Sequence, residues 1–149
     1  MAQRVLFAVN VCVLLHRDGR WLLDLRAPDA GYAPARLGLI GGHVEVIDGP
    51  DHVFENAARR ELVEETGIDL SGIPLHYLDS ELYEDRDRRP VLTVTYVAEL
   101  PAGREPELAR AAEPGRPAWW SLEELEADPR CTPWTPRLVR QAQAVLNPA

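Results

Sequence analysis

The sequence has few cysteines and no long apolar run. Its 149 residues include 2 cysteines, and because Cys12 lies in an apolar segment while Cys131 lies among prolines, neither a disulfide framework nor a zinc site is indicated. A membrane span needs roughly 18 consecutive apolar residues, which no segment provides. The apolar residues 5–15 are interrupted by Asn10 and precede no small-residue cleavage site, so they indicate a strand and not a signal peptide. We expect a cytoplasmic protein that does not enter the membrane.

Basic residues are also scarce relative to acidic ones. Lys and Arg number 16 against 24 Asp and Glu, which gives a net charge of -8. Nucleic acids and anionic membranes are bound mainly through Lys and Arg, so non-specific nucleic-acid binding is not expected. A small polyanion could still bind through a divalent cation held by carboxylates. The length fits one domain over residues 1–149 with its own core, and a homodimer is one option for its assembly.

Short β-rich segments make up most of the pattern. Alternating or continuous apolar residues predict strands, and Asp18-Gly19 between the first two is a frequent hairpin turn. The third strand is short and is followed directly by Gly41-Gly42. The predicted strands cover residues 5–15, 20–26, 37–40, 75–83, 91–100 and 118–121.

Three helices are predicted along the chain. The clearest covers residues 53–66, with Asp51 as its N-terminal cap and Gly67 at its C-terminal stop. Ser121 opens a short helix with a capping-box pattern, and residues 135–146 form a final amphipathic helix. Strands on both sides of a helix suggest an α+β fold, an α/β/α sandwich around a mixed sheet.

The clearest predicted helix carries three glutamates on one face. Glu61, Glu64 and Glu65 stand at i, i+3 and i+4, where like charges repel by roughly 0.2–0.5 kcal/mol per pair. They also lie near the helix C-terminus, where the helix dipole disfavours anions. A divalent cation would offset both penalties, and carboxylate oxygens select Mg²⁺, Mn²⁺ or Ca²⁺. A solvated helix face would explain the glutamates alone, but Gly41 and Gly42, where backbone can approach a ligand closely, favour a metal–phosphate pocket.

The segments around these glutamates closely resemble the Nudix box. Residues 42–45 read Gly-His-Val-Glu, and residues 60–68 read Arg-Glu-Leu-Val-Glu-Glu-Thr-Gly-Ile. The family pattern is G-x5-E-x7-R-E-U-x-E-E-x-G-U, where U is a bulky aliphatic residue, and its second half matches at every fixed position. The order of predicted elements also resembles the Nudix fold over about residues 5–146. The resemblance implies a Nudix-like fold and a hydrolase that cleaves the pyrophosphate linkage of a nucleoside diphosphate derivative.

The first half of the box departs from the family spacing. In the family the arginine stands 14 positions after the glycine, whereas Arg60 stands 18 positions after Gly42. Counted forward from Gly42, the first box glutamate falls at Asp48, and counted back from Arg60 it falls at His52. In the family this glutamate supports the loop and the helix by hydrogen bonding. Asp48 could take that role in part, and His52 less well.

The resemblance also implies roles for the acidic residues. Glu61, Glu64 and Glu65 would bind Mg²⁺, or Mn²⁺ in its place, and the Gly41 carbonyl would be a further ligand. One of these glutamates, or one from a later loop, would orient or deprotonate the attacking water. Glu113 is our candidate from the later loop, and an ordinary solvated acid is the alternative interpretation of that residue.

Other residues would position these acids or the substrate. The resemblance implies that Arg60 holds the glutamates through charged hydrogen bonds and that Glu45 and Gly42 lie within the site. Arg26 follows the second predicted strand and could reach a phosphate. Trp119 could stack on a nucleobase, although adjacent strand residues point to opposite faces, so at least one tryptophan of the Trp-Trp pair should lie in the core.

The predicted substrate is a nucleotide, and dinucleoside compounds, nucleotide sugars and nucleoside or deoxynucleoside triphosphates, oxidised ones included, all stay open. The triphosphates are preferred because family members that cut nucleotide sugars often carry an extra N-terminal region. Two alternatives stay open. The first is a catalytically weak or inactive nucleotide-binding Nudix module, which the altered box spacing motivates. The second is a Nudix enzyme of specialised metabolism.

Overall fold

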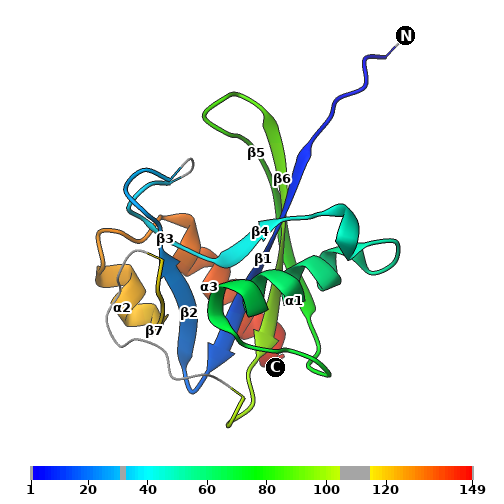
Figure 1. The fold of residues 1–149 in the computed structure, drawn as a ribbon. Helices are drawn as coiled ribbons and strands as arrows, with labels where there is room; N and C mark the ends of the chain where they lie inside the picture. Colours follow the sequence, from blue (N-terminus) through cyan, green and yellow to red (C-terminus); the bar gives the residue numbers. More distant parts are fainter. Residues whose placement is uncertain (1, 31–32, 105–114, 149) are drawn as a thin grey trace.

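The computed structural model describes residues 2–30, 33–104 and 115–148. Within them a seven-stranded mixed sheet carries helices on both faces, which confirms the predicted α/β/α sandwich (Figure 1). The strands are β1 (Ala8–Arg17), β2 (Arg20–Leu25), β3 (Leu37–Gly38), β4 (Ile40–His43), β5 (His76–Glu84), β6 (Pro90–Glu99) and β7 (Pro117–Trp120). The helices are the 3-10 turn η1 (Val46–Asp48), α1 (Val53–Thr66), α2 (Leu122–Ala127) and α3 (Trp134–Leu146). No helix in these residues is both long and apolar enough to cross a membrane.

β1 lies at the centre of the sheet and pairs with three other strands. On one edge it runs parallel to β6 from Ala8 to His16. On the other edge β2 pairs with only His16 and Arg17 before it turns away, and β4 pairs with residues 10–13. The departure of β2 therefore leaves room for β4, which brings its two glycines to the middle of the sheet.

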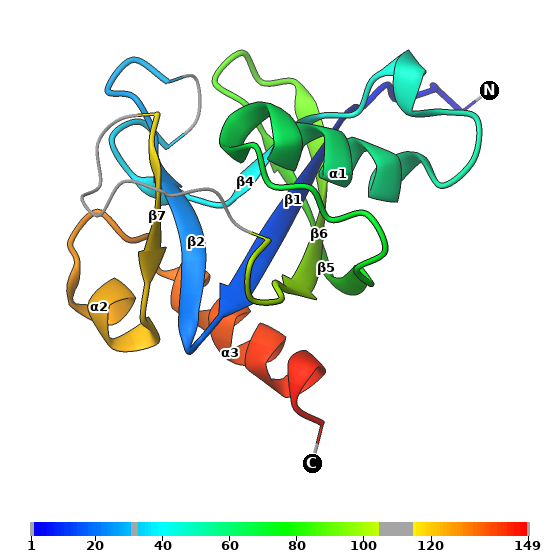
Figure 2. The same cartoon turned by 60° about the horizontal axis from the view of Figure 1, so that its bottom comes forward.

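The alternation of β1 sends its apolar side chains into two cores. Val11, Val13 and Leu15 face α1, whereas Leu14 packs on the opposite face of the sheet with α2 and α3. Figure 2 shows α1 and α3 on opposite sides of the strands. The helix residues fully buried in these two cores are Ala57, Ala58, Leu62, Leu125, Val139 and Ala142.

The predicted strands are found, with two corrections. β1 begins at Ala8 and not at residue 5, because residues 5–7 have no strand partner among the described residues and Leu6 is 87% exposed. The predicted strand 37–40 is divided into β3, which pairs with β2, and β4, which pairs with β1. Gly41-Gly42 thus lies inside β4 and not after its end. The other four strand predictions agree with the structure to within one or two residues at each end.

The helix α1 has the predicted bounds but not the predicted cap. His52 occupies the N-cap position with φ 52° and makes no side-chain cap hydrogen bond. The prediction of Asp51 as cap is wrong, because the left-handed backbone at His52 places that residue at the helix start and the Asp51 carbonyl instead accepts a bond from Asn56 Nδ2 at 3.0 Å. Gly67 ends the helix as predicted, with φ 75°.

Candidate active site

The predicted carboxylates lie on the last turns of α1, beside β4. Glu61 is 12% exposed and Glu64 is 57% exposed. A side chain at Gly42 would place its Cβ 2.5 Å from the Glu61 carboxylate, and one at Gly41 would meet the Val11 carbonyl at 2.1 Å. Both positions therefore require glycine for different reasons. Gly41 permits the pairing of β4 with β1, and Gly42 permits the approach of Glu61.

Arg60 connects three segments of the site. Its Nε and Nη2 donate to the two carboxylate oxygens of Asp48 at 2.8 and 3.0 Å, which is a bidentate charged pair. Nη1 donates to Glu61 at 2.9 Å and to Glu64 at 3.3 Å, and Nη2 also donates to the His43 carbonyl at 2.9 Å. One guanidinium thus joins η1, the end of β4 and the acidic face of α1. Its hydrogen bonds to Glu61 and Glu64 are of the kind that the resemblance implies, whereas Glu65 is hydrogen-bonded to Gly41.

The structure resolves which residue stands in for the first box glutamate. Asp48 is 3% exposed, and besides Arg60 it accepts the backbone N–H of Glu45 at 2.7 Å. The hydrogen bonds from the Arg60 guanidinium hold the pKa of Asp48 below its usual range. His52, the other candidate, starts α1 instead. Because η1 folds back toward α1, the longer connection brings the shorter aspartate side chain to Arg60.

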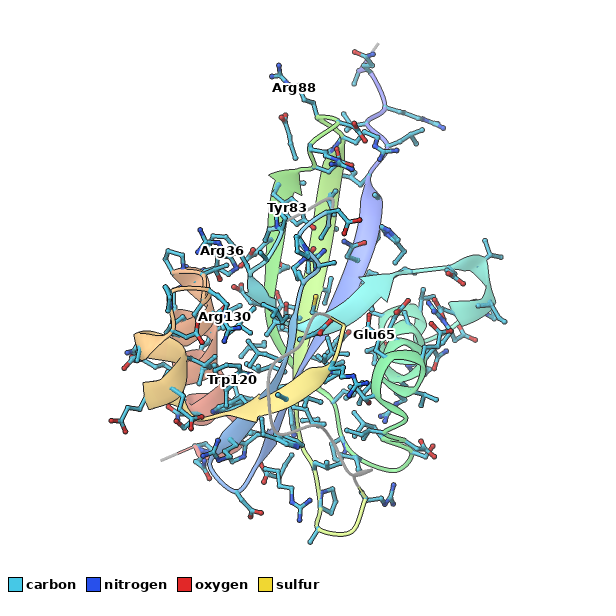
Figure 3. All side chains as sticks on the ribbon, turned by 60° about the vertical axis from the view of Figure 1, so that its left-hand side comes forward. Arg36, Glu65, Tyr83, Arg88, Trp120 and Arg130 are labelled. Atoms are coloured by element: carbon cyan, nitrogen blue, oxygen red, sulfur yellow. The ribbon has the colours of Figure 1, made fainter. Side chains whose placement is uncertain are left out.

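Glu65 faces β4 at the junction of α1 with the sheet (Figure 3). Its carboxylate accepts the backbone N–H of Gly41 at 3.3 Å. Burial raises the pKa of Glu65 to about 7, and the nearby negative charges of Glu61 and Asp24 add to this effect, while the Gly41 bond and the positive charge of Arg26 oppose it. Like charges gathered this closely favour a bound cation, which would lower this pKa again.

A cavity of about 1190 Å³ opens beside Glu65. Its lining comes from strands β1 to β6, from the segment that follows β2, from the turn between β5 and β6 and from the first turns of α3. Glu65, Gly41 and Gly42 form part of one wall, and Arg26 contributes to the same lining. Ligand pockets typically measure roughly 300–1,000 Å³, so this cavity has room for a nucleotide-sized ligand next to the acidic residues.

The structure does not bring every predicted residue to this cavity. Trp119 is absent from the described lining; it pairs with Leu22 in the sheet and packs against the α1-side core. Trp120 packs on the other face, 5.8 Å from the Arg130 guanidinium (Figure 3). The two tryptophans therefore point to opposite faces, as the strand alternation predicts. Glu113 lies outside the described residues.

Three polar residues of the lining were not singled out from the sequence. Asp24 follows Leu22 on the α1 side of β2, and its Oδ1 is buried without a hydrogen-bond partner in the described part of the chain. Burial raises the pKa of Asp24. The strand alternation, which puts this carboxylate on an apolar face, was the available signal. Asn10 and Thr93 also line the cavity, and Asn10 stood out only as a polar residue in an apolar run.

The carboxylates are not already arranged around a single point. Among residues 2–30, 33–104 and 115–148, no three His, Cys, Asp or Glu side chains are grouped so that they could hold a metal ion. Glu61 and Glu64 face Arg60, whereas Glu65 faces Gly41. The potential ligands therefore form two adjacent sets on one helix face.

Comparisons with known proteins point to one family. The chain matches the model of the NUDIX domain family over residues 6–142. It is 43% identical to nucleoside triphosphatase NudI of Escherichia coli O1:K1 over 60 residues, which is 40% of this chain and 40% of NudI. The match thus spans less than half the length of this curated relative.

Solved structures share the fold over nearly the whole chain. A MutT NUDIX hydrolase from Burkholderia pseudomallei is 28% identical, with a TM-score of 0.63 over 90% of this chain and 96% of that one. The Caenorhabditis elegans Ap4A hydrolase is 22% identical, with a TM-score of 0.68 over 95% of this chain and 100% of that one. The second likeness shows the fold alone. With a family match over residues 6–142, the chain belongs to the Nudix family.

Proposed function

We propose that this chain is a divalent-metal-dependent pyrophosphohydrolase that acts on nucleoside diphosphate derivatives, with nucleoside triphosphates as the favoured class. The observation that carries the proposal is the position of Glu65 of α1 and the two glycines of β4 at one wall of a nucleotide-sized cavity, with the Glu61 carboxylate packed against Gly42. The printed activities of relatives support it, since one is a nucleoside triphosphatase and another structure is that of an Ap4A hydrolase.

The residues present fit a hard divalent cation. Glu61, Glu64 and Glu65 offer only oxygen ligands, and so does the Gly41 carbonyl, which suits Mg²⁺ or Mn²⁺. The absence of a side chain at Gly42 leaves the space that the Glu61 carboxylate occupies. When bound, the cation would neutralise the pyrophosphate oxygens and lower the pKa of an attacking water.

The chain's own residues would position these groups. Asp48 fixes Arg60, and Arg60 fixes Glu61 and Glu64 through charged hydrogen bonds. Arg26 lies in the cavity lining near Glu65 and would contact a phosphate of the substrate. Glu65 lines the cavity beside Gly41, where it would orient or deprotonate the attacking water. Glu113 stays a prediction for the same role.

The contacts of Asp48 favour an active enzyme over an inactive binding module. The altered box spacing was the reason to consider lost catalysis. Asp48 makes a bidentate bond to Arg60 and accepts a backbone N–H, which are hydrogen bonds of the kind expected from the first box glutamate. The hydrogen bonds that would support the acidic face of α1 are therefore present despite the longer connection between β4 and α1.

A substrate panel tests the proposal. Purified protein is incubated with ribonucleoside and deoxyribonucleoside triphosphates, dinucleoside polyphosphates and nucleotide sugars in Mg²⁺ or Mn²⁺, and the products are separated by anion-exchange chromatography. We expect cleavage of a phosphate–phosphate bridge in at least one triphosphate, and none in the presence of EDTA. Tight nucleotide binding without turnover of any compound would overturn the proposal in favour of the binding module.

Two further properties belong to this proposal. Cys12 and Cys131 are both free thiols, which suits a reducing compartment, so we propose that the enzyme works in the cytoplasm. Assembly as a homodimer stays a prediction, which size-exclusion chromatography with light scattering would test.

A further inference from the structure

A row of polar side chains crosses the floor of the cavity on three adjacent strands. Asn10 of β1 is in register with Thr93 of β6, and Thr93 is in register with Glu81 of β5. All three line the same cavity as Glu65. Further along the same face of the sheet, Leu14 and Val97 are in register and belong to the apolar core beneath α3. The polar row therefore lies beyond the apolar core beneath α3, and Arg137 of α3 still approaches it at Glu81.

Two atoms of this row are buried without a hydrogen-bond partner in the described residues, Asn10 Oδ1 and Thr93 Oγ1. The Asn10 amide is oriented by its other end, since Nδ2 donates to the Tyr83 hydroxyl at 3.4 Å, and Figure 3 shows Tyr83 on β5. Folded proteins rarely leave buried polar atoms unpaired, so each such atom calls for a partner, which a bound ligand could supply.

The row presents mainly hydrogen-bond acceptors. Asn10 offers its amide oxygen and Glu81 its carboxylate, while the Thr93 hydroxyl can accept or donate. The Arg137 guanidinium reaches Glu81 only at 3.7 Å, and the Glu81 side chain is 36% exposed. These three side chains thus present more acceptor atoms than donor groups, so a ligand that supplies N–H groups would satisfy the row.

This requirement distinguishes the nucleobases. Guanine carries a ring N–H next to an amino group, and a carboxylate can accept both at once. Uracil and thymine carry one ring N–H between two carbonyl oxygens, which a carboxylate repels. Resting on the proposed function for the phosphate end, we propose that Asn10, Thr93 and Glu81 read the base and make this enzyme selective for guanine nucleotides over uracil nucleotides.

Binding measurements test the selectivity independently of turnover. The α,β-methylene diphosphates of guanosine, inosine and uridine are titrated into the full chain with Mg²⁺ in a calorimeter. Inosine lacks only the amino group of guanosine. We expect the guanosine compound to bind about tenfold tighter than the uridine compound, with the inosine compound in between, as one well-formed bidentate contact provides. Equal affinities for the three, or no binding of any, would overturn the inference.

Two variants assign the effect to the row. Glu81→Gln should abolish the preference for guanosine over inosine, and Thr93→Val should weaken guanosine binding several-fold. Glu84→Gln is the matched control, because Glu84 lies on the same strand at a position of opposite alternation. An unchanged guanosine-to-inosine ratio in Glu81→Gln would contradict the assignment, and the wild-type ratios decide the selectivity even if a variant fails to fold.

The outcomes separate this inference from the proposed function. Turnover of triphosphates without any base preference would leave the hydrolase proposal standing and overturn the selectivity. Selective binding of the guanosine compound without turnover of any triphosphate would do the reverse.

Discussion

The acidic face of α1 and the floor of the adjacent cavity differ in how their polar groups are satisfied. On the α1 side, Arg60 donates to Asp48, Glu61, Glu64 and the His43 carbonyl, so the chain itself fixes the acidic face. On the floor, Asn10 and other polar residues hold atoms with no partner in the described residues. Because the acidic face already has its hydrogen bonds, it can hold its geometry before substrate arrives. The floor, where such atoms have no partner among the described residues, gains hydrogen bonds from the ligand. We therefore assign the chemistry to the acidic face of α1 and the base selectivity to the floor.

The largest expected effect comes from a substitution that removes a negative charge from the acidic face of α1. Glu64→Gln keeps the shape of the side chain but loses a negative oxygen ligand, so kcat should fall on the order of 100-fold or more. Glu64 is 57% exposed, and the free energy of unfolding should change little. Steady-state triphosphate hydrolysis with a parallel thermal melt checks both. Retained activity in a folded variant would show that the metal assignment is wrong.

The next effect concerns the anchor of Arg60. Asp48→Asn removes the negative charge from the bidentate pair with Arg60, in which the Asp48 side chain is 3% exposed. The free energy of unfolding should fall by about 1.5–3 kcal/mol at neutral pH. Arg60 would still donate its hydrogen bond to Glu61, which limits the loss of stability. Because the folded pKa of Asp48 is lowered, this stability is present above the unfolded pKa and is lost as pH falls.

Urea denaturation at pH 7 and at pH 3 measures this loss. The matched control is Asp51→Asn, an exposed aspartate of the same connection, which should change the free energy of unfolding by less than about 0.5 kcal/mol. Equal effects of the two substitutions would mean that Asp48 does not anchor the site.

The two glycines of β4 should respond differently to alanine. In Gly42→Ala the new Cβ would meet the side-chain carboxylate of Glu61, so activity should fall by about 10- to 100-fold while the fold persists. In Gly41→Ala the new Cβ would meet the backbone carbonyl of Val11, so stability should fall first. Melting temperatures and kcat/KM of both variants measure the contrast, and the opposite pattern would refute the two roles.

The smallest expected effect is a pH dependence at Glu65. Its folded pKa of about 7 lies above the ordinary value of 4.5, so the metal-free folded protein holds a proton that the unfolded chain releases. The stability contribution is therefore present below the unfolded pKa and is lost as pH rises toward 7. The wild type should lose stability relative to Glu65→Gln between about pH 4.5 and pH 7 in EDTA. Parallel stability curves for the two proteins would contradict the raised pKa.

Local patterns predicted one part of the site well. The bounds of α1 and the shared face of Glu61, Glu64 and Glu65 follow from helix formers, a C-terminal glycine and the helical period, which all act within one segment. The facing of Trp119 and Trp120 followed from strand alternation in the same way.

Other features depended on contacts between distant segments. The selection of Asp48 over His52 depends on how the longer connection folds back on α1, which the spacing alone left open. The row that joins Asn10 to Thr93 depends on the parallel register of β1 and β6, which no local signal specifies.

The most direct test of the central claim is Mn²⁺ binding followed by electron paramagnetic resonance, because it requires no substrate. Titration of the wild-type chain should reduce the free Mn²⁺ signal, and Glu61→Gln, Glu64→Gln and Glu65→Gln should each weaken binding about tenfold or more, with Glu84→Gln unchanged. Equal binding by the wild type and all three α1 variants would contradict the claim that this acidic face is the metal site.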